Sequence, residues 1–219
     1  MSTMQVTSVN IGDARRLDLG RREVTTGIYK RPVAGPVHIG RLGIAGDLVA
    51  DAKHHGGPDQ SIYVYGGDDY DWWSRELGED IAPGTFGDNI TIAGLASAEL
   101  AIGDRLKIGR EVVLEVSAPR IPCAVLSARM GTGSFVRRFR DAERPGVYCR
   151  VISEGGVEAG DGVTTSRYEG DRVPVLDVFR DFYAREPEAG QLRRFLATPL
   201  GERARRDIQA RFDKLGGAP

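Results

Sequence analysis

Glycine divides most of this chain into short apolar runs, and this spacing limits what the chain can fold into. Between residues 5 and 165 the runs are rich in Val, Ile, Tyr and Thr, as in VTSVNI, EVTTGI, SIYVYG, NITIAG, EVVLEVS and GVYCRVI. Runs of this length, bounded by glycine, are typical of β-strands. The 29 glycines among 219 residues supply the turns that many short strands need. The pattern predicts a mainly β region.

Three Gly-Asp steps lie beside apolar residues, in GIAGDLVAD (43–51), LAIGDRLKIG (100–109) and VEAGDGVTT (157–165). Glycine adopts positive φ without a steric penalty, and an aspartate side chain can bond to the backbone of a turn. Each step therefore predicts a corner between two strands. The repeats are too short to be the units of a solenoid.

Two segments inside the β region have helical spacing instead. In GDDYDWWSRELG the apolar residues Tyr70, Trp73 and Leu77 recur at i, i+3 and i+7, and Gly78 fits the position that follows a helix. The segment PCAVLSARMG allows a second, short helix that begins at or just after Pro122. We predict one helix in each segment.

The pattern changes after residue 168, where the hinge EGDRVP precedes apolar residues at helical spacing. These residues are Val175, Val178, Phe179, Phe182 and Tyr183, then Leu192, Phe195 and Leu196, then Ala204, Ile208, Phe212 and Leu215. We therefore divide the chain into a β domain at 1–168 and a helical extension at 169–219. The arginines of the extension are interpreted as a solvated helix face in preference to a nucleic-acid interface.

The composition excludes several classes of protein. The formal net charge of −1 provides no overall basic field for nucleic acid, and no apolar stretch reaches the length of a membrane span. The two cysteines are 26 positions apart, which excludes a disulfide framework and a cysteine-rich zinc site. Neither a GxxxxGK[ST] loop, a GxSxG elbow nor a GxGxxG turn is found. We expect a cytoplasmic protein that is not driven by nucleotide hydrolysis.

Cys123 is the strongest candidate for a reactive group. It follows Arg120 by three positions, has prolines close before it at 119 and 122, and lies at the start of the predicted short helix. A nearby arginine and a helix N-terminus both favour the thiolate, which can act as a ligand or a nucleophile. A buried, inert thiol is the alternative for Cys123. That structural role is the preferred interpretation for Cys149, which lies inside the strand-like GVYCRVI.

Two further segments carry polar groups whose roles the residues alone leave open. His55 and Asp59 flank a Gly-Gly-Pro turn with free backbone N–H groups, which could hold an anion. A polar turn capped by Asp59 is the alternative. Lys30 ends a strand-like run before a proline-held turn, where it could meet a phosphate or simply be a solvated strand end.

Six segments, taken together and in order, resemble the MOSC domain family. They are YKRPVAGPV (29–37), LGIAGDLVADAKHHGGPDQSIYVY (42–65), TFGDNIT (85–91), AIGDRLKIG (101–109), SAPRIPCAVLS (117–127), and GVYCRVI with VEAGDGV. The resemblance is narrower to the bacterial 6-N-hydroxylaminopurine-resistance type, which carries a helical C-terminal extension. Asp88, Gln60 and Ala124 differ from the residues usual at their positions, and this leaves the substrate preference open.

The resemblance implies a mainly β fold, a MOSC-type β-barrel with peripheral helices and a small C-terminal helical subdomain. It also implies the molybdenum cofactor (Mo-molybdopterin), with the Cys123 thiolate as the protein ligand of the metal. Lys30 and Arg120 would anchor its phosphate or the polar edge of the pterin. The residues implied as cofactor contacts are Lys30, His55, Asp59, Asn89 and Arg120.

The implied activity is the reduction of N-hydroxylated, hydroxylaminopurine-like compounds. A separate reductase would supply the electrons, because the sequence shows no flavin, haem or iron–sulfur motif. Two alternatives remain: a sulfur carrier or transferase that uses a Cys123 persulfide, and a non-catalytic carrier of the cofactor. The helical tail could pack on its own domain or pair with a second subunit as a homodimer. Neither a membrane nor a nucleic acid is expected as a partner.

Overall fold

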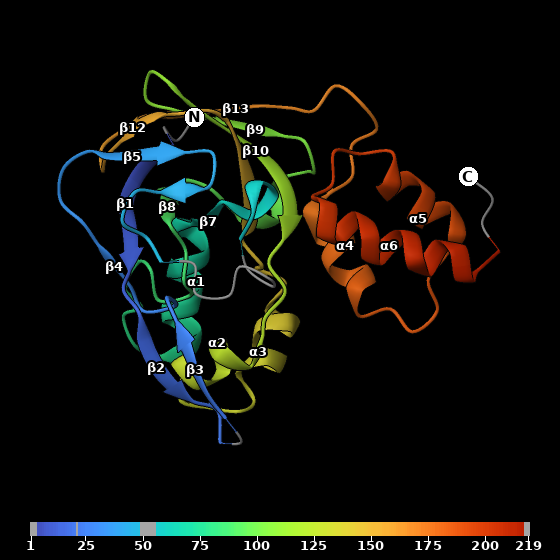
Figure 1. Ribbon diagram of the computed structural model, residues 1–219, viewed down its shortest axis with the longest axis horizontal. Coiled ribbons are helices and arrows are strands. Elements are labelled where there is room, and N and C mark those ends of the chain that lie inside the picture. Colours follow the sequence, from blue (N-terminus) through green and yellow to red (C-terminus); the bar gives the residue numbers. More distant parts are fainter. Residues whose placement is uncertain (1–3, 21, 49–55, 217–219) are drawn as a thin grey trace.

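The computed structural model describes residues 4–20, 22–48 and 56–216, and a large sheet forms its framework. The strands of this sheet are β1 (Gln5–Gly12), β4 (Lys30–Pro32), β7 (Ile62–Gly66), β8 (Ile90–Ala93), β9 (Arg105–Ile108), β10 (Val112–Pro119), β11 (Val147–Ser153) and β13 (Val163–Ser166). Their order is β13-β9-β10-β11-β7-β8-β1-β4 (Figure 1). The pairs are antiparallel except β7 and β8, which run parallel.

The strand sequences explain how the sheet is buried. In β9 only Leu106 and Ile108 are buried, because alternate side chains of a strand point to opposite faces. In β10 almost every residue is buried, which indicates that both faces are covered. Helices of the C-terminal extension cover one of these faces, since α4 (Val175–Phe182) contacts β10.

The expected barrel is corrected, because the strand pairing leaves this sheet open. Its outer strands are β13 and β4. Near β13 the sheet reaches β1 through one isolated bridge, Gln5 to Gly162. Backbone hydrogen bonds also join this place, from the Val6 N–H to the Asp161 carbonyl at 2.9 Å, from the Gly160 N–H to the Val6 carbonyl at 2.8 Å and from the Val163 N–H to the Met4 carbonyl at 2.9 Å. A turn containing Gly160, with φ of 100°, lies at this place, and β1 and β13 are not neighbouring strands of the sheet. The fold is mixed α/β with a large mixed sheet.

Two smaller sheets complete the β region. One has the order β12-β5-β6, and the other is the hairpin of β2 and β3. Their bounds are β2 (Arg15–Asp18), β3 (Glu23–Thr26), β5 (Val37–Gly40), β6 (Gly43–Ile44) and β12 (Gly155–Val157). The β2–β3 hairpin matters for function, because β3 forms part of a cavity wall.

Both helices predicted inside the β region are confirmed. The first is α1 (Gly67–Leu77), which provides the crossover that the parallel pair β7 and β8 requires, and Gly78 ends it with φ of 72°. The second is α2 (Ala124–Arg129). A further helix, α3 (Phe135–Ala142), was not predicted. It packs Phe135 and Phe139 into an aromatic cluster with Trp73.

The three C-terminal helical runs are confirmed as α4, α5 (Ala189–Leu196) and α6 (Glu202–Lys214). Figure 1 shows them gathered beside the sheet on the side of β10. Val178, Phe195 and Ile208 belong to the same hydrophobic core as the strand residues, so these helices share their core with the sheet. The domain boundary at 168 stays a prediction.

The arginines of these helices are largely paired within the extension. Arg194 pairs with Asp171, and Arg206 pairs with Glu202. Arg211 donates to Asp181 at 2.6 Å. These pairs fit the predicted solvated helix face. In the described part of the chain, no helix is both long and apolar enough to cross a membrane.

Candidate functional site

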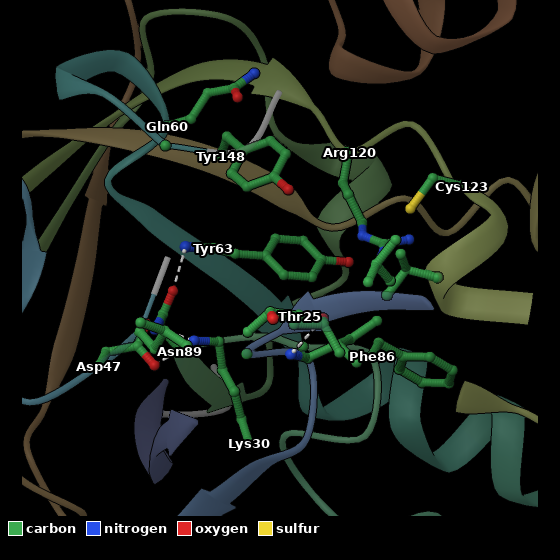
Figure 2. A pocket seen from close by; sticks show the side chains of 18 of the residues that line it. Thr25, Lys30, Asp47, Gln60, Tyr63, Phe86, Asn89, Arg120, Cys123 and Tyr148 are labelled. Carbon is green, nitrogen blue, oxygen red and sulfur yellow. Dashed lines mark hydrogen bonds and ion pairs between the residues drawn. The ribbon is translucent and has the colours of Figure 1, made fainter. Parts of the chain in front are cut away.

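A cavity of about 170 Å³ lies where β3, the start of β4 and the segment before α2 meet. Four of the predicted site residues line it: Lys30, Asn89, Arg120 and Cys123. Figure 2 shows their side chains with those of Asp47, Gln60, Tyr63 and Tyr148 around the same space. The structure thus brings together predicted residues as far apart as Lys30 and Cys123, which are 93 positions from each other in the sequence.

Arg120 is the most unusual group in this cavity. It follows the last residue of β10 and is only 4% exposed. Its guanidinium lies over the rings of Tyr63 and Phe139, at 5.6 and 5.4 Å from the ring centroids. Its Nε and Nη1 atoms have no hydrogen-bond partner among the described residues. Such buried donors cost stability unless a ligand accepts from them.

Cys123 lies at the other side of the same space. It is half-buried and occupies the N-cap position of α2, with extended backbone, and its carbonyl accepts the Leu126 N–H at 3.0 Å. In Figure 2 its sulfur points toward the Arg120 guanidinium. The thiol interacts electrostatically with Arg120 and with Tyr148. The predicted proximity of Arg120 and Cys123 is therefore confirmed.

Tyr148 connects these two groups. It lies in β11, and its phenol is hydrogen-bonded to the Arg120 side chain. Burial raises the pKa of Tyr148, and the charge of Arg120 opposes that shift. The phenol therefore remains a proton donor at neutral pH. Sequence analysis missed Tyr148. It lies in the strand-like run GVYCRVI, of which only Cys149 was considered as a candidate.

Cys149 itself has the structural role that was predicted for it. It is fully buried in the main core, and burial raises the pKa of its thiol. Neighbouring residues of a strand point to opposite faces, so Tyr148 faces the cavity while Cys149 faces the core.

Lys30 is held in place by a carboxylate that sequence analysis missed. Its ammonium forms an ion pair with Asp47, and both side chains are more than nine-tenths buried. Burial lowers the pKa of Lys30, and Asp47 opposes that shift. Asp47 also accepts the Asn89 Nδ2–H and the Gly12 N–H, each at 2.8 Å. Lys30 is thus a fixed, partly neutralised charge and not a solvated strand end.

Asn89 is fixed from both ends of its amide. Its Nδ2 donates to Asp47, and its Oδ1 accepts the Tyr63 N–H at 3.1 Å. The preceding residue, Asp88, is fully buried behind it and accepts from the Tyr70 hydroxyl at 2.6 Å and from the Thr91 hydroxyl at 2.7 Å. Burial raises the pKa of Asp88. These bonds fix the turn that presents Asn89 to the cavity.

Asp59 is not among the described residues that line the cavity, so its role as a cofactor contact stays a prediction. Asp59 lies in η1 (Pro58–Gln60), and its carboxylate is directed to the C-terminal extension. Its Oδ2 accepts the Glu202 N–H at 2.7 Å, and its Oδ1 pairs with Arg150 Nε at 2.9 Å. The next residue, Gln60, lines the cavity instead. His55 lies outside the described residues, so its role stays a prediction.

A second, larger cavity of about 500 Å³ joins the first. One wall is the segment 118–125, and the other is formed by α4 and α6. The residues that line both cavities are Arg22, Gln60, Cys123, Val125 and Tyr148. Cys123 therefore stands at the junction of a polar cavity and a groove under the C-terminal helices.

The described residues hold no cluster of three or more His, Cys, Asp and Glu side chains that could bind a metal ion. A protein-only metal site is therefore not formed by this part of the chain. One thiolate can still complete the coordination of a metal whose other donors belong to an organic cofactor. Cys123 is placed for that role.

Comparison with known proteins supports the resemblance seen in the sequence. The model of the MOSC domain matches residues 51–164. Protein YflK of Bacillus subtilis (strain 168), which is uncharacterized, is 36% identical over 71% of this chain and 70% of that protein. A protein of Gibberella moniliformis named reductase is 30% identical over 81% of this chain, which spans only 32% of that protein.

Solved structures agree in fold. The crystal structure of YiiM from Geobacillus stearothermophilus has a TM-score of 0.79 at 27% identity, covering 95% of this chain and 99% of that one. YiiM from Escherichia coli has a TM-score of 0.76 at 24% identity, covering 100% of this chain and 95% of that one. The sequence match and the fold lead to one conclusion: this chain belongs to the MOSC domain family.

Proposed function

We propose that this protein binds the molybdenum cofactor (Mo-molybdopterin) and reduces N-hydroxylated compounds of the hydroxylaminopurine type. The observation that carries the proposal is the buried Arg120 guanidinium, with two unpartnered nitrogen atoms, beside the Cys123 thiol. Membership of the MOSC domain family and the relative named reductase support a redox role.

The residues present fit this cofactor. Cys123 offers a soft sulfur donor, which suits molybdenum, and Arg120 offers N–H donors to a phosphate or to the polar edge of a pterin. Lys30, fixed by Asp47, adds a cation at the opposite end of the cavity. When bound, the cofactor would supply the Lewis acidity and the two electrons of the reaction.

The protein's own groups would bind, orient and supply protons. Reduction of a hydroxylamine, R–NHOH, to the amine, R–NH₂, and water consumes two electrons and two protons. Tyr148 Oη lies at the junction of the two cavities and is held by Arg120, so it can donate one of these protons. Arg120 favours the thiolate of Cys123 by its charge.

We propose that the electrons come from a separate reductase. The Gibberella moniliformis protein named reductase extends far beyond the part that matches this chain, which spans 32% of it. The additional length in that protein leaves room for a further redox domain. For the chain described here, the electrons would then arrive on a partner protein.

Replacement of Cys123 tests the proposal. We expect Cys123→Ala to reduce turnover of 6-hydroxylaminopurine by more than about 100-fold and to lower the molybdenum content, because the metal loses its protein ligand. Cys149→Ala is the matched control and should keep both, because Cys149 faces the core. The measurements are turnover with a supplied reductase, elemental analysis and the fluorescence of released pterin.

Two outcomes would decide against the proposal. Full turnover in metal-loaded Cys123→Ala would exclude the thiolate ligand. Cyanide-releasable sulfur on Cys123 in a protein without molybdenum would favour a sulfur carrier.

A further inference from the structure

We propose that Asp47 is a positioning residue, which keeps the buried Lys30 ammonium charged and fixed so that it can bind an oxyanion of the ligand. The place is the cavity of about 170 Å³ that Lys30 and Arg120 line, called the first cavity below. In Figure 2, Asp47 and Lys30 lie on the side of this cavity away from Cys123. The inference rests on the proposed function, because the oxyanion would belong to the cofactor of that reaction.

The Asp47 carboxylate connects three separate segments of the chain. Its Oδ1 accepts the Gly12 N–H at the end of β1, and its Oδ2 accepts the Asn89 Nδ2–H, each at 2.8 Å. The Lys30 ammonium lies against both oxygens. The Asp47 side chain is 5% exposed and the Lys30 side chain 8%, so water screens this ion pair very little. Asp47 thus determines where both cavity-lining donors, Lys30 and Asn89, are held.

Close contact between backbone segments places Asp47 at this point. A Cβ atom on Gly12 would lie 2.2 Å from the Gly27 carbonyl oxygen and 3.1 Å from Lys30 Cγ. A Cβ atom on Gly27 would lie 2.2 Å from the Leu48 carbonyl oxygen. Only glycine permits such an approach, and the Leu48 N–H donates to the Gly12 carbonyl at 3.1 Å. The backbone beside Asp47 is therefore packed directly against β1 and the start of β4.

The charges around the first cavity leave room for an anion. The charged side chains among the described residues that line it are Arg22, Lys30, Arg120 and Asp47. Two further negative charges are near: the buried Asp88 carboxylate, which faces Lys30, and a thiolate of Cys123 at the far end. When all these groups are ionised the charges balance, so no surplus of negative charge repels an oxyanion. The lining side-chain atoms that are buried without a partner both belong to Arg120, and a guanidinium is suited to a negatively charged acceptor.

The burial of Lys30 makes its charge depend on Asp47. Burial lowers the pKa of Lys30, while the charge and the hydrogen bonds of Asp47 raise it, followed by the charge of Asp88. Without the Asp47 carboxylate, burial is opposed mainly by Asp88, so Lys30 would lose its proton at a lower pH. The phenols of the cavity, Tyr63 and Tyr148, stay protonated, because burial raises the pKa of each. A neutral Lys30 amine would offer no charge to an oxyanion.

NMR of the lysine side chains tests the charge of Lys30 directly. The chain has four lysines, so ¹³C-labelled lysine gives four Cε signals, and Lys30→Met identifies the signal of Lys30. We expect Asp47→Asn to shift the titration of this signal to lower pH than in the wild type. Asp161→Asn is the matched control, because Asp161 also follows a glycine and accepts a backbone N–H, from Glu158 at 2.9 Å, but does not line the cavity. An unchanged Lys30 titration in folded Asp47→Asn would overturn the inference.

A binding measurement tests the oxyanion itself. The probe is sulfate, whose charge is constant between pH 6 and pH 9, titrated into the full-length, cofactor-free protein and followed by the backbone amide signals of Lys30 and Asn89. Relative to the wild type at the same pH, Asp47→Asn should raise the sulfate Kd about tenfold at pH 9 and less than about threefold at pH 6, because acid restores the ammonium. Lys30→Met should raise it about tenfold at both pH values, and Asp161→Asn at neither.

Three results of the sulfate titration would overturn the inference. Equal weakening of Asp47→Asn at pH 6 and pH 9 would mean that Asp47 serves only the fold. Tighter binding by Asp47→Asn would mean that Asp47 competes with the anion for Lys30. No binding of sulfate by the wild type would exclude the oxyanion.

Turnover separates this inference from the proposed function, because neither NMR measurement needs the cofactor. If the cofactor-loaded wild type reduces 6-hydroxylaminopurine while Asp47→Asn keeps the wild-type Lys30 titration and sulfate Kd, the role of Asp47 is wrong and the function stands. If both NMR results are as expected but the loaded wild type never turns over with a supplied reductase, the oxyanion site stands and the function is wrong.

Discussion

At the scale of one residue, Arg120 shows how a side chain that is placed to bind a ligand can lower the stability of the ligand-free protein. The buried guanidinium has lost its hydrogen bonds to water, and protein groups replace only some of them, because two of its nitrogen atoms have no partner among the described residues. Two aromatic contacts and the bond to Tyr148 offset only part of that cost. A ligand that accepts from Nε and Nη1 would supply the rest.

We therefore predict that Arg120→Met makes the cofactor-free protein more stable and lowers its affinity for the cofactor. The free energy of unfolding in urea should rise by about 1 kcal/mol, because an apolar side chain of similar length removes the unpartnered donors. Molybdenum content after gel filtration should fall by about tenfold or more.

Arg16→Met is the control for this prediction, since Arg16 is exposed in the β2–β3 hairpin and should change neither quantity. A cofactor-free Arg120→Met protein that is clearly less stable than the wild type would mean that Arg120 serves the fold and not the ligand.

At this scale the sequence predicted that Cys123 and Arg120 lie close together, but it did not predict the partners of the other cavity residues. Cys123 and Arg120 are three positions apart, so local spacing was enough to bring them together. Asp47 appeared only as part of a Gly-Asp turn, and its pairing with Lys30 depends on how β1, β4 and the loop after β6 come together in space. Asp59 was placed in the cavity, but a contact 143 positions away determines its direction.

At the scale of elements, the hydrogen bond from the Glu202 N–H to the Asp59 carboxylate joins the start of α6 to η1. Gly201 is the N-cap residue of α6 and has no side chain to accept a helix N–H. Asp59 supplies the missing acceptor from η1, and a Cβ on Gly201 would approach the Asp59 Cβ to 3.2 Å. Arg150 completes the junction by pairing with Asp59 and donating to the Pro199 carbonyl at 2.9 Å.

We predict that Asp59→Ala loosens α6 more than it lowers global stability. Loss of a capping acceptor costs about 1 kcal/mol, and the partly exposed pair with Arg150 adds less than about 1 kcal/mol. Amide hydrogen exchange at the start of α6 should accelerate about fivefold or more, because the Glu202 N–H loses its acceptor.

Glu202→Gln is the control for α6. Its side chain is exposed and pairs with Arg206 four positions later, and the substitution keeps the backbone N–H that Asp59 accepts, so exchange rates should stay close to wild-type values. Unchanged exchange in Asp59→Ala would show that hydrophobic packing alone holds α6 in place.

Sequence patterns predicted those elements whose apolar residues repeat strongly. The helices α1, α4, α5 and α6 have regular apolar positions, and their partners lie in the shared core. By contrast, half of the residues of α3 are charged, and its buried residues are Phe135 and Phe139. Long-range contacts determine that β7 and β8 pair in parallel and that the sheet stays open. The alternation of apolar and polar residues along a strand does not encode such contacts.

At the scale of the whole molecule, buried phenols connect the fold to pH. Tyr63, Tyr65 and Tyr70 are packed in one aromatic cluster around Phe86. Their hydroxyls donate to the Pro145 carbonyl, the Arg144 carbonyl and the Asp88 carboxylate, at 2.9, 2.8 and 2.6 Å. Burial raises the pKa of all three phenols well above the ordinary value of 10.0. Ionisation would remove each donor and place an anion in the core.

We predict that the protein loses stability steeply above pH 10. In the unfolded chain these phenols release their protons near pH 10.0, while in the folded protein they keep them. The folded state then binds more protons, so the free energy of unfolding falls as pH rises, by about 1.4 kcal/mol per pH unit for each phenol and about 4 kcal/mol for three. Tyr148, whose pKa burial also raises, adds to this slope. Urea unfolding at pH 8, 10 and 11 measures the slope, and Tyr63→Phe should reduce it by about 1.4 kcal/mol per pH unit. The phenolate absorbance of the native protein should show fewer than the seven tyrosines of the chain until it unfolds. Seven ionised tyrosines in the folded protein near pH 10 would contradict the burial of these phenols.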